Sequence, residues 1–160
     1  MQMPSSISTR LQYQHKSLLD LIEGLSDEQI RRQVIIGKWS IFENIVHLQT
    51  YQHTFIDRVK QMLEQDNPSF SRYTAEADPL FLDNCSKSSR EIMQDFITIR
   101  KEMIVGVFSF NESDFNKSGQ HPVFGKMNLL LWLNFFLLHE AHHLFAIFML
   151  TAAVKIHVQQ

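Results

Sequence analysis

The chain of 160 residues (18.8 kDa) suits one domain, and its 44% of hydrophobic residues excludes an intrinsically disordered protein. Its 15 Lys and Arg and 17 Asp and Glu give a formal net charge of −2, which disfavours nucleic-acid binding. Only 5 Gly and 4 Pro are present, and this scarcity favours long helices. We therefore expect a single helical domain over residues 1–160.

The first predicted helix ends near Gly24. It is supported by residues at alternating spacings of four and three, which place them on one helix face: Leu11, His15, Leu18, Ile22 and Leu25. A second helix is predicted to begin after Ser40 and to continue to about Glu64. Ser40 and Glu43 have the S-x-x-E spacing of a capping box, in which both side chains bind backbone N–H groups at the start of the helix.

Two further helices complete the pattern. Residues 66–84 contain Pro68 and Pro79 and predict a long crossover without a packed helix of its own, and a third helix follows over about residues 86–108. Residues 109–125 predict another irregular connection. The last helix is the most apolar and is therefore predicted to be the most buried. Four amphipathic helices around one core predict an all-α four-helix bundle with long crossover loops.

The longest apolar stretch covers residues 127–154, but Asn, Glu and His residues interrupt it. This interruption favours a buried helix over a membrane span. The first ten residues lack the apolar segment of a signal peptide, and Cys85 is the only cysteine, so it cannot form an internal disulfide. We expect a cytoplasmic protein that does not associate with membranes.

Two histidines in the last predicted helix, His139 and His143, lie four residues apart and share one face. That face also carries apolar residues that predict burial: Leu129, Trp132, Phe136, Ala146 and Leu150. A buried histidine must be neutral and hydrogen-bonded, or bound to a metal. From this spacing alone, a metal site and a pair of hydrogen-bonded core histidines are equally good interpretations.

A third histidine would favour the metal. His47 is the best candidate, because the stripe of the second helix that carries it also includes polar Asn44 and Thr50 and could line a cavity. Three imidazoles would leave coordination positions open for water or a substrate, as in catalytic zinc sites.

Other polar residues are candidates for roles near these ligands. Glu43 has two interpretations, a helix cap and a carboxylate that orients His47, of which the cap is favoured. Tyr51, one helical turn after His47, is a candidate pocket residue.

The remaining histidines are assigned by their helix faces. His15 lies on the apolar stripe of the first helix, where core hydrogen bonding is favoured over a place in the cavity. His142 is turned by about 100° from His143 and is predicted to support the site or to lie at an interface. His121 falls in a predicted loop and is expected on the surface.

Residues 139–143 read H-E-A-H-H and match the H-E-x-x-H motif of zinc metalloproteases, in which Glu140 would be the general base. Those proteases combine helices with strands, whereas this chain predicts helices only. The five-residue pattern also arises easily by chance in a histidine-rich helix. Both points disfavour a protease.

Several motifs together resemble the DinB-like superfamily. Gly37-Lys38-Trp39-Ser40 precedes the helix with His47, and His121-Pro122-Val123-Phe124-Gly125 precedes the helix with His139 and His143. The resemblance covers nearly the whole chain. It implies an up-down-down-up four-helix bundle, often a homodimer, with a divalent metal such as zinc or nickel bound by the residues that match His47, His139 and His143.

Members of that superfamily include bacillithiol transferases and a mycothiol-dependent maleylpyruvate isomerase, and others are regarded as metal-dependent hydrolases. This chain has Ala146 where the family often has Gln, which implies a less polar pocket. The leading hypothesis is a metal-dependent S-transferase or hydrolase that acts on a small molecule, with a low-molecular-weight thiol or water as the second reactant. The alternative is a non-enzymatic bundle, stabilised by metal, that serves as a binding or dimerisation module.

Overall fold

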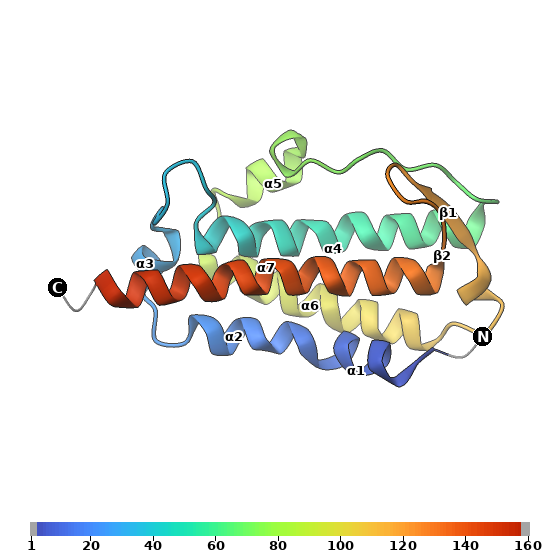
Figure 1. The fold of residues 1–160 in the computed structure, drawn as a ribbon, viewed down its shortest axis with the longest axis horizontal. Coiled ribbons are helices and arrows are strands. Elements are labelled where there is room, and N and C mark those ends of the chain that lie inside the picture. The colour runs from blue at the N-terminus through green and yellow to red at the C-terminus, as the bar shows by residue number, and fades with distance from the viewer. Residues whose placement is uncertain (1–2, 158–160) are drawn as a thin grey trace.

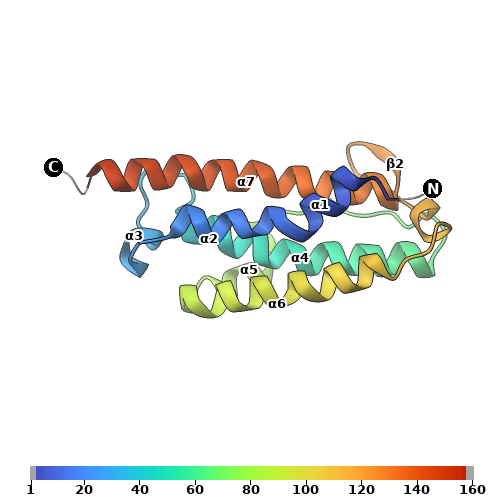
Figure 2. The ribbon, with the colours of Figure 1, turned by 90° about the horizontal axis from the view of Figure 1, so that it is seen from below.

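Four long helical segments lie side by side along the molecule in the computed structural model, which describes residues 3–157 (Figure 1). The first segment is interrupted by a single 3₁₀ turn, and the other three are continuous: α1 (Ser5–Tyr13) with α2 (Ser17–Ile22), α4 (Ile41–Glu64), α6 (Ser89–Phe108) and α7 (Leu129–His157). The second and third segments run parallel to each other and antiparallel to the first and last (Figures 1 and 2). The predicted four-helix bundle is confirmed, with the up-down-down-up order.

The connections contain more structure than the sequence predicts. A short helix, α3 (Asp27–Arg31), follows the first segment, and the long crossover contains α5 (Pro79–Asn84). The prediction that this crossover has no packed helix is therefore wrong. Asp78 accepts a hydrogen bond from the N–H of Leu80, Pro79 occupies the first turn, and Phe81 is buried.

A small antiparallel hairpin, β1 (Ser118–His121) and β2 (Gly125–Asn128), lies before α7 where an irregular loop is predicted. Gly125 has a φ of 69°, the left-handed conformation that closes a three-residue hairpin loop. The His121 Nδ1 accepts hydrogen bonds from the backbone N–H groups of Val123 and Phe124, at 3.1 and 3.2 Å. These strands are short and polar, so they lack the alternation by which strands are recognised.

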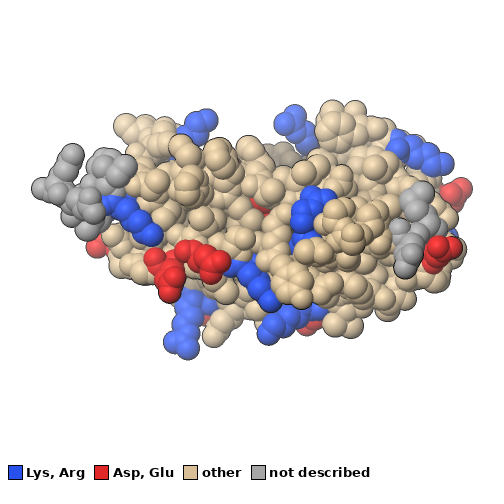
Figure 3. Space-filling model, turned by 60° about the horizontal axis from the view of Figure 1, so that its bottom comes forward, with Lys and Arg blue, Asp and Glu red and all other residues tan. Residues whose placement is uncertain are grey.

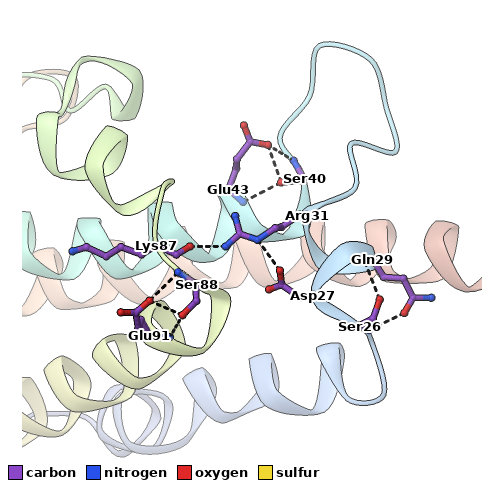
Figure 4. Close-up of polar contacts among 9 residues, drawn as sticks. All are labelled: Ser26, Asp27, Gln29, Arg31, Ser40, Glu43, Lys87, Ser88 and Glu91. Carbon is purple, nitrogen blue, oxygen red and sulfur yellow. Dashed lines mark hydrogen bonds and ion pairs between the residues drawn. The ribbon is translucent and has the colours of Figure 1, made fainter.

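Capping boxes begin three of the helices at the same end of the bundle (Figure 4). The pairs are Ser26 with Gln29 in α3, Ser40 with Glu43 in α4, and Ser88 with Glu91 in α6. Arg31 joins two of these helix starts, because it pairs with Asp27 and donates to the carbonyl of Lys87. The predicted start of the second long helix is confirmed.

The core consists of two apolar clusters. One lies toward the hairpin and includes Leu11, Phe55, Met62, Met103, Trp132 and Phe136. The other lies toward the opposite end and includes Leu18, Ile45, Ile92, Phe96, Leu144 and Ile147. Between the clusters each long segment contributes polar side chains, which we call the polar layer: Gln14, His15, His47, Gln52, Arg100, His139, Glu140 and His143.

A buried ion pair forms one half of the polar layer. The Arg100 guanidinium and the Glu140 carboxylate, 0% and 1% exposed, bind each other, and the Arg100 Nε donates to Gln52 Oε1 at 2.7 Å. Gln14 Nε2 donates to Glu140 Oε1 at 2.9 Å. Because each charged group has several partners, the cost of burying it is offset.

The last helix is less enclosed than predicted. Its outer face exposes about half or more of five large apolar side chains: Leu131, Leu138, Phe145, Phe148 and Met149. The helix that is buried along most of its length is α4 instead. By length and composition, the segment Leu129–Lys155 of α7 could also cross a membrane, a property that core helices of soluble bundles share.

Candidate metal centre

Three histidines from two helices meet on one side of the polar layer. His47 comes from α4, and His139 and His143 come from successive turns of α7. One ring nitrogen of each lies within 4.8 Å of the others, and the Nε2 atoms of His47 and His139 are 3.1 Å apart. Two nitrogens bound to one zinc, each at 2.0–2.1 Å, are separated by at most about 4.2 Å. The spacing of this pair therefore fits a shared metal ion.

The protonation of these histidines also suits metal binding. The pKa of each is lowered to about 3, first by burial and then by the neighbouring imidazoles. All three are therefore neutral at pH 7, and only a neutral imidazole has a nitrogen lone pair free for a metal.

Asn44 orients one of the three rings. Its amide donates to the Ser40 carbonyl at 2.8 Å, and its Oδ1 lies 2.9 Å from the His143 Nδ1. This contact assigns the His143 proton to Nδ1, so Nε2 is the nitrogen left for a metal. Asn44 lies one turn before His47 on α4, and the capping residue Ser40 therefore anchors the support of the site.

Two aromatic rings cover the histidines. The Trp39 ring centroid lies 5.0 Å from that of His47 and 6.0 Å from that of His143, and the ring centroid of Phe81 of α5 lies 5.5 Å from that of Trp39. The Tyr51 ring lies 4.4 Å from that of His139. The short helix α5, which the sequence does not predict, thus supports Trp39 beside the three histidines.

A cavity of about 760 Å³ opens at His47 and His139. Its walls come from α4, α7, the hairpin and the crossover, and include Trp39, Tyr51, Arg58, Tyr73, His121 and Phe135. A second cavity of about 640 Å³ lies on the other side of Trp39, where Asn44, His142, His143, Ala146 and Met149 contribute to its lining. The second cavity is largely apolar, as the resemblance implies for a chain with alanine at position 146.

The structure separates the proposed supporting residues. Tyr51 lines the larger cavity and His142 the smaller one. The Glu43 carboxylate accepts hydrogen bonds from the N–H and hydroxyl of Ser40, so the cap interpretation is confirmed. No hydrogen bond joins Glu43 to His47 among the described residues.

Glu140 does not face the three histidines. It is one residue from His139 and is therefore turned by about 100° around α7, where it binds Arg100 in the core. A metalloprotease needs this carboxylate beside the metal-bound water. The contacts of Glu140 argue against that chemistry.

His15 lies in the polar layer but lines neither of the two cavities. It is 4% exposed, and burial, followed by the charges of Arg100 and Lys16, lowers its pKa to about 4. Its ring contacts Phe96 edge-on at 6.3 Å. The structure places it in the core, but the hydrogen bond that the sequence favours is not found, because its buried Nδ1 has no partner among the described residues.

The buried His15 predicts a specific acid sensitivity. The pKa of His15 is lower in the folded protein than the ordinary value of 6.5. As the pH falls, the unfolded chain therefore takes up a proton before the folded protein does, and the free energy of unfolding decreases between about pH 6.5 and pH 4. The loss is on the order of 3 kcal/mol. Urea unfolding of wild type and His15→Gln should show the wild type losing more stability over this range. Parallel pH profiles would contradict the assignment.

Sequence reasoning misses two residues of the larger cavity. His121 is predicted on the surface, but the hairpin turns it inward, where its ring lies 5.0 Å from that of Phe135. Arg58 is predicted on the solvated edge of the second helix, with Asp57 and Lys60, and this prediction is wrong, because its side chain is 7% exposed. The residues His121 to Gly125 belong to the motif of the resemblance, and that motif was the available signal for His121.

Comparisons with known proteins agree with this architecture. The sequence model of the DinB superfamily matches residues 10–147. YuaE, an uncharacterised protein of Bacillus subtilis strain 168, is 27% identical over 77% of this chain and 83% of its own length.

Two solved structures share the fold. YfiT from Bacillus subtilis, a probable metal-dependent hydrolase with an unusual four-helix bundle topology, matches 94% of this chain and 86% of its own with a TM-score of 0.80 and 18% identity. TT2238, a four-helix bundle protein, matches 89% of this chain and 94% of its own with a TM-score of 0.63 and 19% identity.

Proposed function

Because the chain belongs to the DinB superfamily, we propose that it is a metal-dependent enzyme in which His47, His139 and His143 hold a divalent cation. The observation that carries this proposal is the convergence of three neutral imidazoles, of which His47 and His139 line the larger cavity and His143 lines the smaller one. Structural zinc sites are closed by four protein ligands. In the part of the chain that the structure describes, the cluster contains three such side chains, and this supports a catalytic site.

Hydrolysis of a small molecule is the reaction we propose first. A zinc or nickel ion suits imidazole ligands and, when bound, supplies a Lewis acid that lowers the pKa of water or of a thiol. The likeness to YfiT supports hydrolysis. Asn44 orients the His143 ring, and the rings of Trp39 and Tyr51 restrict the access of water to His47 and His139.

We propose that His121 is a hydrogen-bond donor to the substrate in this cavity. Its Nδ1 accepts two backbone N–H groups, so the proton of the neutral ring lies on Nε2. The ring lines the same cavity as His47 and His139. It can therefore donate a hydrogen bond from its Nε2–H to an oxygen of the substrate within the cavity.

Transfer of a low-molecular-weight thiol is the second candidate reaction. It is favoured by the second cavity, which reaches His143 from the other side of Trp39. Two cavities that meet at one group of ligands suit two reactants, a thiol and an electrophile, whereas hydrolysis needs one organic substrate.

Metal content is the first test. Plasma mass spectrometry of tag-free protein should find about one equivalent of divalent metal in the wild type and little in His47→Ala or His143→Ala. His142→Ala is the matched control, because this neighbouring histidine is exposed and should leave the metal content unchanged. Absence of metal from the wild type after incubation with zinc, nickel or manganese would refute the metal site.

Turnover assays then separate the two reactions. The metal-loaded protein is offered ester, amide and phosphoester panels without thiol, and electrophile panels with thiol. Activity that His139→Ala removes would support an enzyme, and the dependence on thiol would identify its class. A metal-loaded protein inactive on every panel would favour the non-enzymatic bundle.

We also propose that the protein is a cytoplasmic homodimer joined through the outer face of α7. Leu131, Leu138 and Phe145 recur there every seven residues, the spacing of a seam between packed helices. Figure 3 views the molecule obliquely from below and shows scattered charged side chains with uncharged surface between them. A second copy can cover such a face with the same residues by a two-fold axis.

Sedimentation of the purified protein tests the dimer. We expect a dimer at micromolar concentration for the wild type and a monomer for the double variant Leu138→Glu/Phe145→Glu, because the introduced charges would be buried. The metal content should stay the same in both. A wild-type monomer, or a double variant that still dimerises, would exclude this interface.

A further inference from the structure

The larger cavity contains a buried cation for which residues 3–157 supply no counter-ion. Arg58 is 7% exposed, and none of the ion pairs among the described residues involves it. Its Nη2 donates to the Ser71 carbonyl at 2.9 Å and its Nη1 to the Tyr51 hydroxyl at 3.5 Å. A guanidinium has five N–H donors, so these bonds leave three without a protein partner in the described chain.

Aromatic rings hold the Arg58 guanidinium in place without neutralising it. Its Cζ lies 5.5 Å from the ring centroids of both Phe70 and Trp132 and 6.0 Å from that of Tyr51. In this fold the other buried arginine, Arg100, is fully paired with a carboxylate. Arg58 is therefore preorganised for a negative group that the described residues do not supply.

Carboxylates near Arg58 are exposed and do not compensate it. Asp57, the residue before Arg58, is exposed. Glu76 is an exposed residue of the cavity wall, and so is Arg72, whose positive charge opposes that of Glu76. The pKa of His121 is lowered first by burial and second by the charge of Arg58. The cavity is thus positive on the side that Arg58 and His121 line.

Tyr51 connects this cation to the three histidines. Its hydroxyl is at Arg58, and its ring centroid lies 4.4 Å from that of His139. The guanidinium and His139 therefore contact the same phenol, Arg58 at its hydroxyl and His139 at its ring, and both line the larger cavity.

We propose that Arg58 binds an oxyanion of the substrate, a carboxylate or a phosphate, while the reacting group of the same molecule lies at His47, His139 and His143. This inference rests on the proposed function and adds the class of substrate: a small anionic molecule whose charge and reacting bond lie far enough apart to reach along Tyr51. The aromatic wall formed by Trp39 and Phe135 suits an apolar middle section.

Calorimetric titration tests this site with three probes on metal-loaded protein: benzoate, phenyl phosphate and the neutral benzyl alcohol. We expect Arg58→Gln to weaken binding of at least one anion by about 10- to 100-fold, Arg58→Lys to weaken it less, and benzyl alcohol to be unaffected. The preferred anion identifies the oxyanion. Arg90→Gln, an exposed arginine of α6, is the control and should bind as the wild type does.

The same titrations on metal-free protein separate this inference from the proposed function. If the protein binds no metal but Arg58→Gln still weakens anion binding, the anion site stands and the metal-dependent function fails. Two results with metal-loaded protein would overturn the anion site. One is that Arg58→Gln binds each anion as tightly as the wild type does, and the other is that the wild type binds neither anion. Should Arg58→Gln not fold, a crystal structure of the wild type with phenyl phosphate decides, because the phosphate must contact Arg58.

Discussion

Replacement of Arg100 by methionine is expected to lower the free energy of unfolding by about 3–5 kcal/mol. The Glu140 carboxylate, 1% exposed, would keep Gln14 as a partner but lose its counter-ion, and Gln52 Oε1 would lose the donor at 2.7 Å. Urea denaturation followed by circular dichroism measures the loss.

A second substitution distinguishes a lost charge from lost packing. The double variant Arg100→Met/Glu140→Leu should recover much of the stability, because removal of both charges leaves no unpaired ion in the core. Arg90→Met, on the exposed side of the same helix, should change the stability by less than about 0.5 kcal/mol. A double variant as unstable as Arg100→Met would show that the ion pair is not the cause.

Replacement of His139 by alanine is expected to weaken zinc binding by more than about 100-fold. Four-ligand zinc sites in peptides bind with roughly 10–16 kcal/mol, or about 3 kcal/mol for each ligand. Asn44→Ala should weaken zinc binding by about 10- to 100-fold, because it removes only the partner of His143 Nδ1. Competition with a zinc-sensitive dye measures the series.

The metal-free protein should remain folded. The two apolar clusters pack on either side of the polar layer and do not need an ion to meet. Chelation is therefore expected to lower the melting temperature but to preserve the helical circular dichroism spectrum at 25 °C. Loss of helix on chelation would favour a structural metal site. Equal zinc affinity in His139→Ala and wild type would exclude the proposed ligand set.

The parts of the fold that the sequence predicts are those with local signals. The capping box of Ser40 and Glu43 locates the start of α4, and the four-residue spacing of His139 and His143 places both on one face of α7. The polar residues on the same stripe of α4 predict His47 as the third ligand, and the structure places it beside His139 and His143.

The parts that the sequence does not predict depend on contacts between distant segments. Arg58 looks like a solvated charge in a helical pattern, and only the aromatic rings of the crossover and α7 bury it. His121 faces inward because a short polar hairpin turns it. The apolar composition of α7 suggests burial on all sides, but composition does not distinguish a core face from an outer one.

The polar layer also determines how the four helices align along their lengths. An apolar seam tolerates a shift by one helical turn of about 5.4 Å, because one aliphatic side chain replaces another. The same shift of α7 would move Glu140 away from Arg100 and His139 away from His47 in one step. The alignment that pairs the buried charges is therefore the one that completes the histidine cluster, and a chain that folds with slipped helices would lose both together.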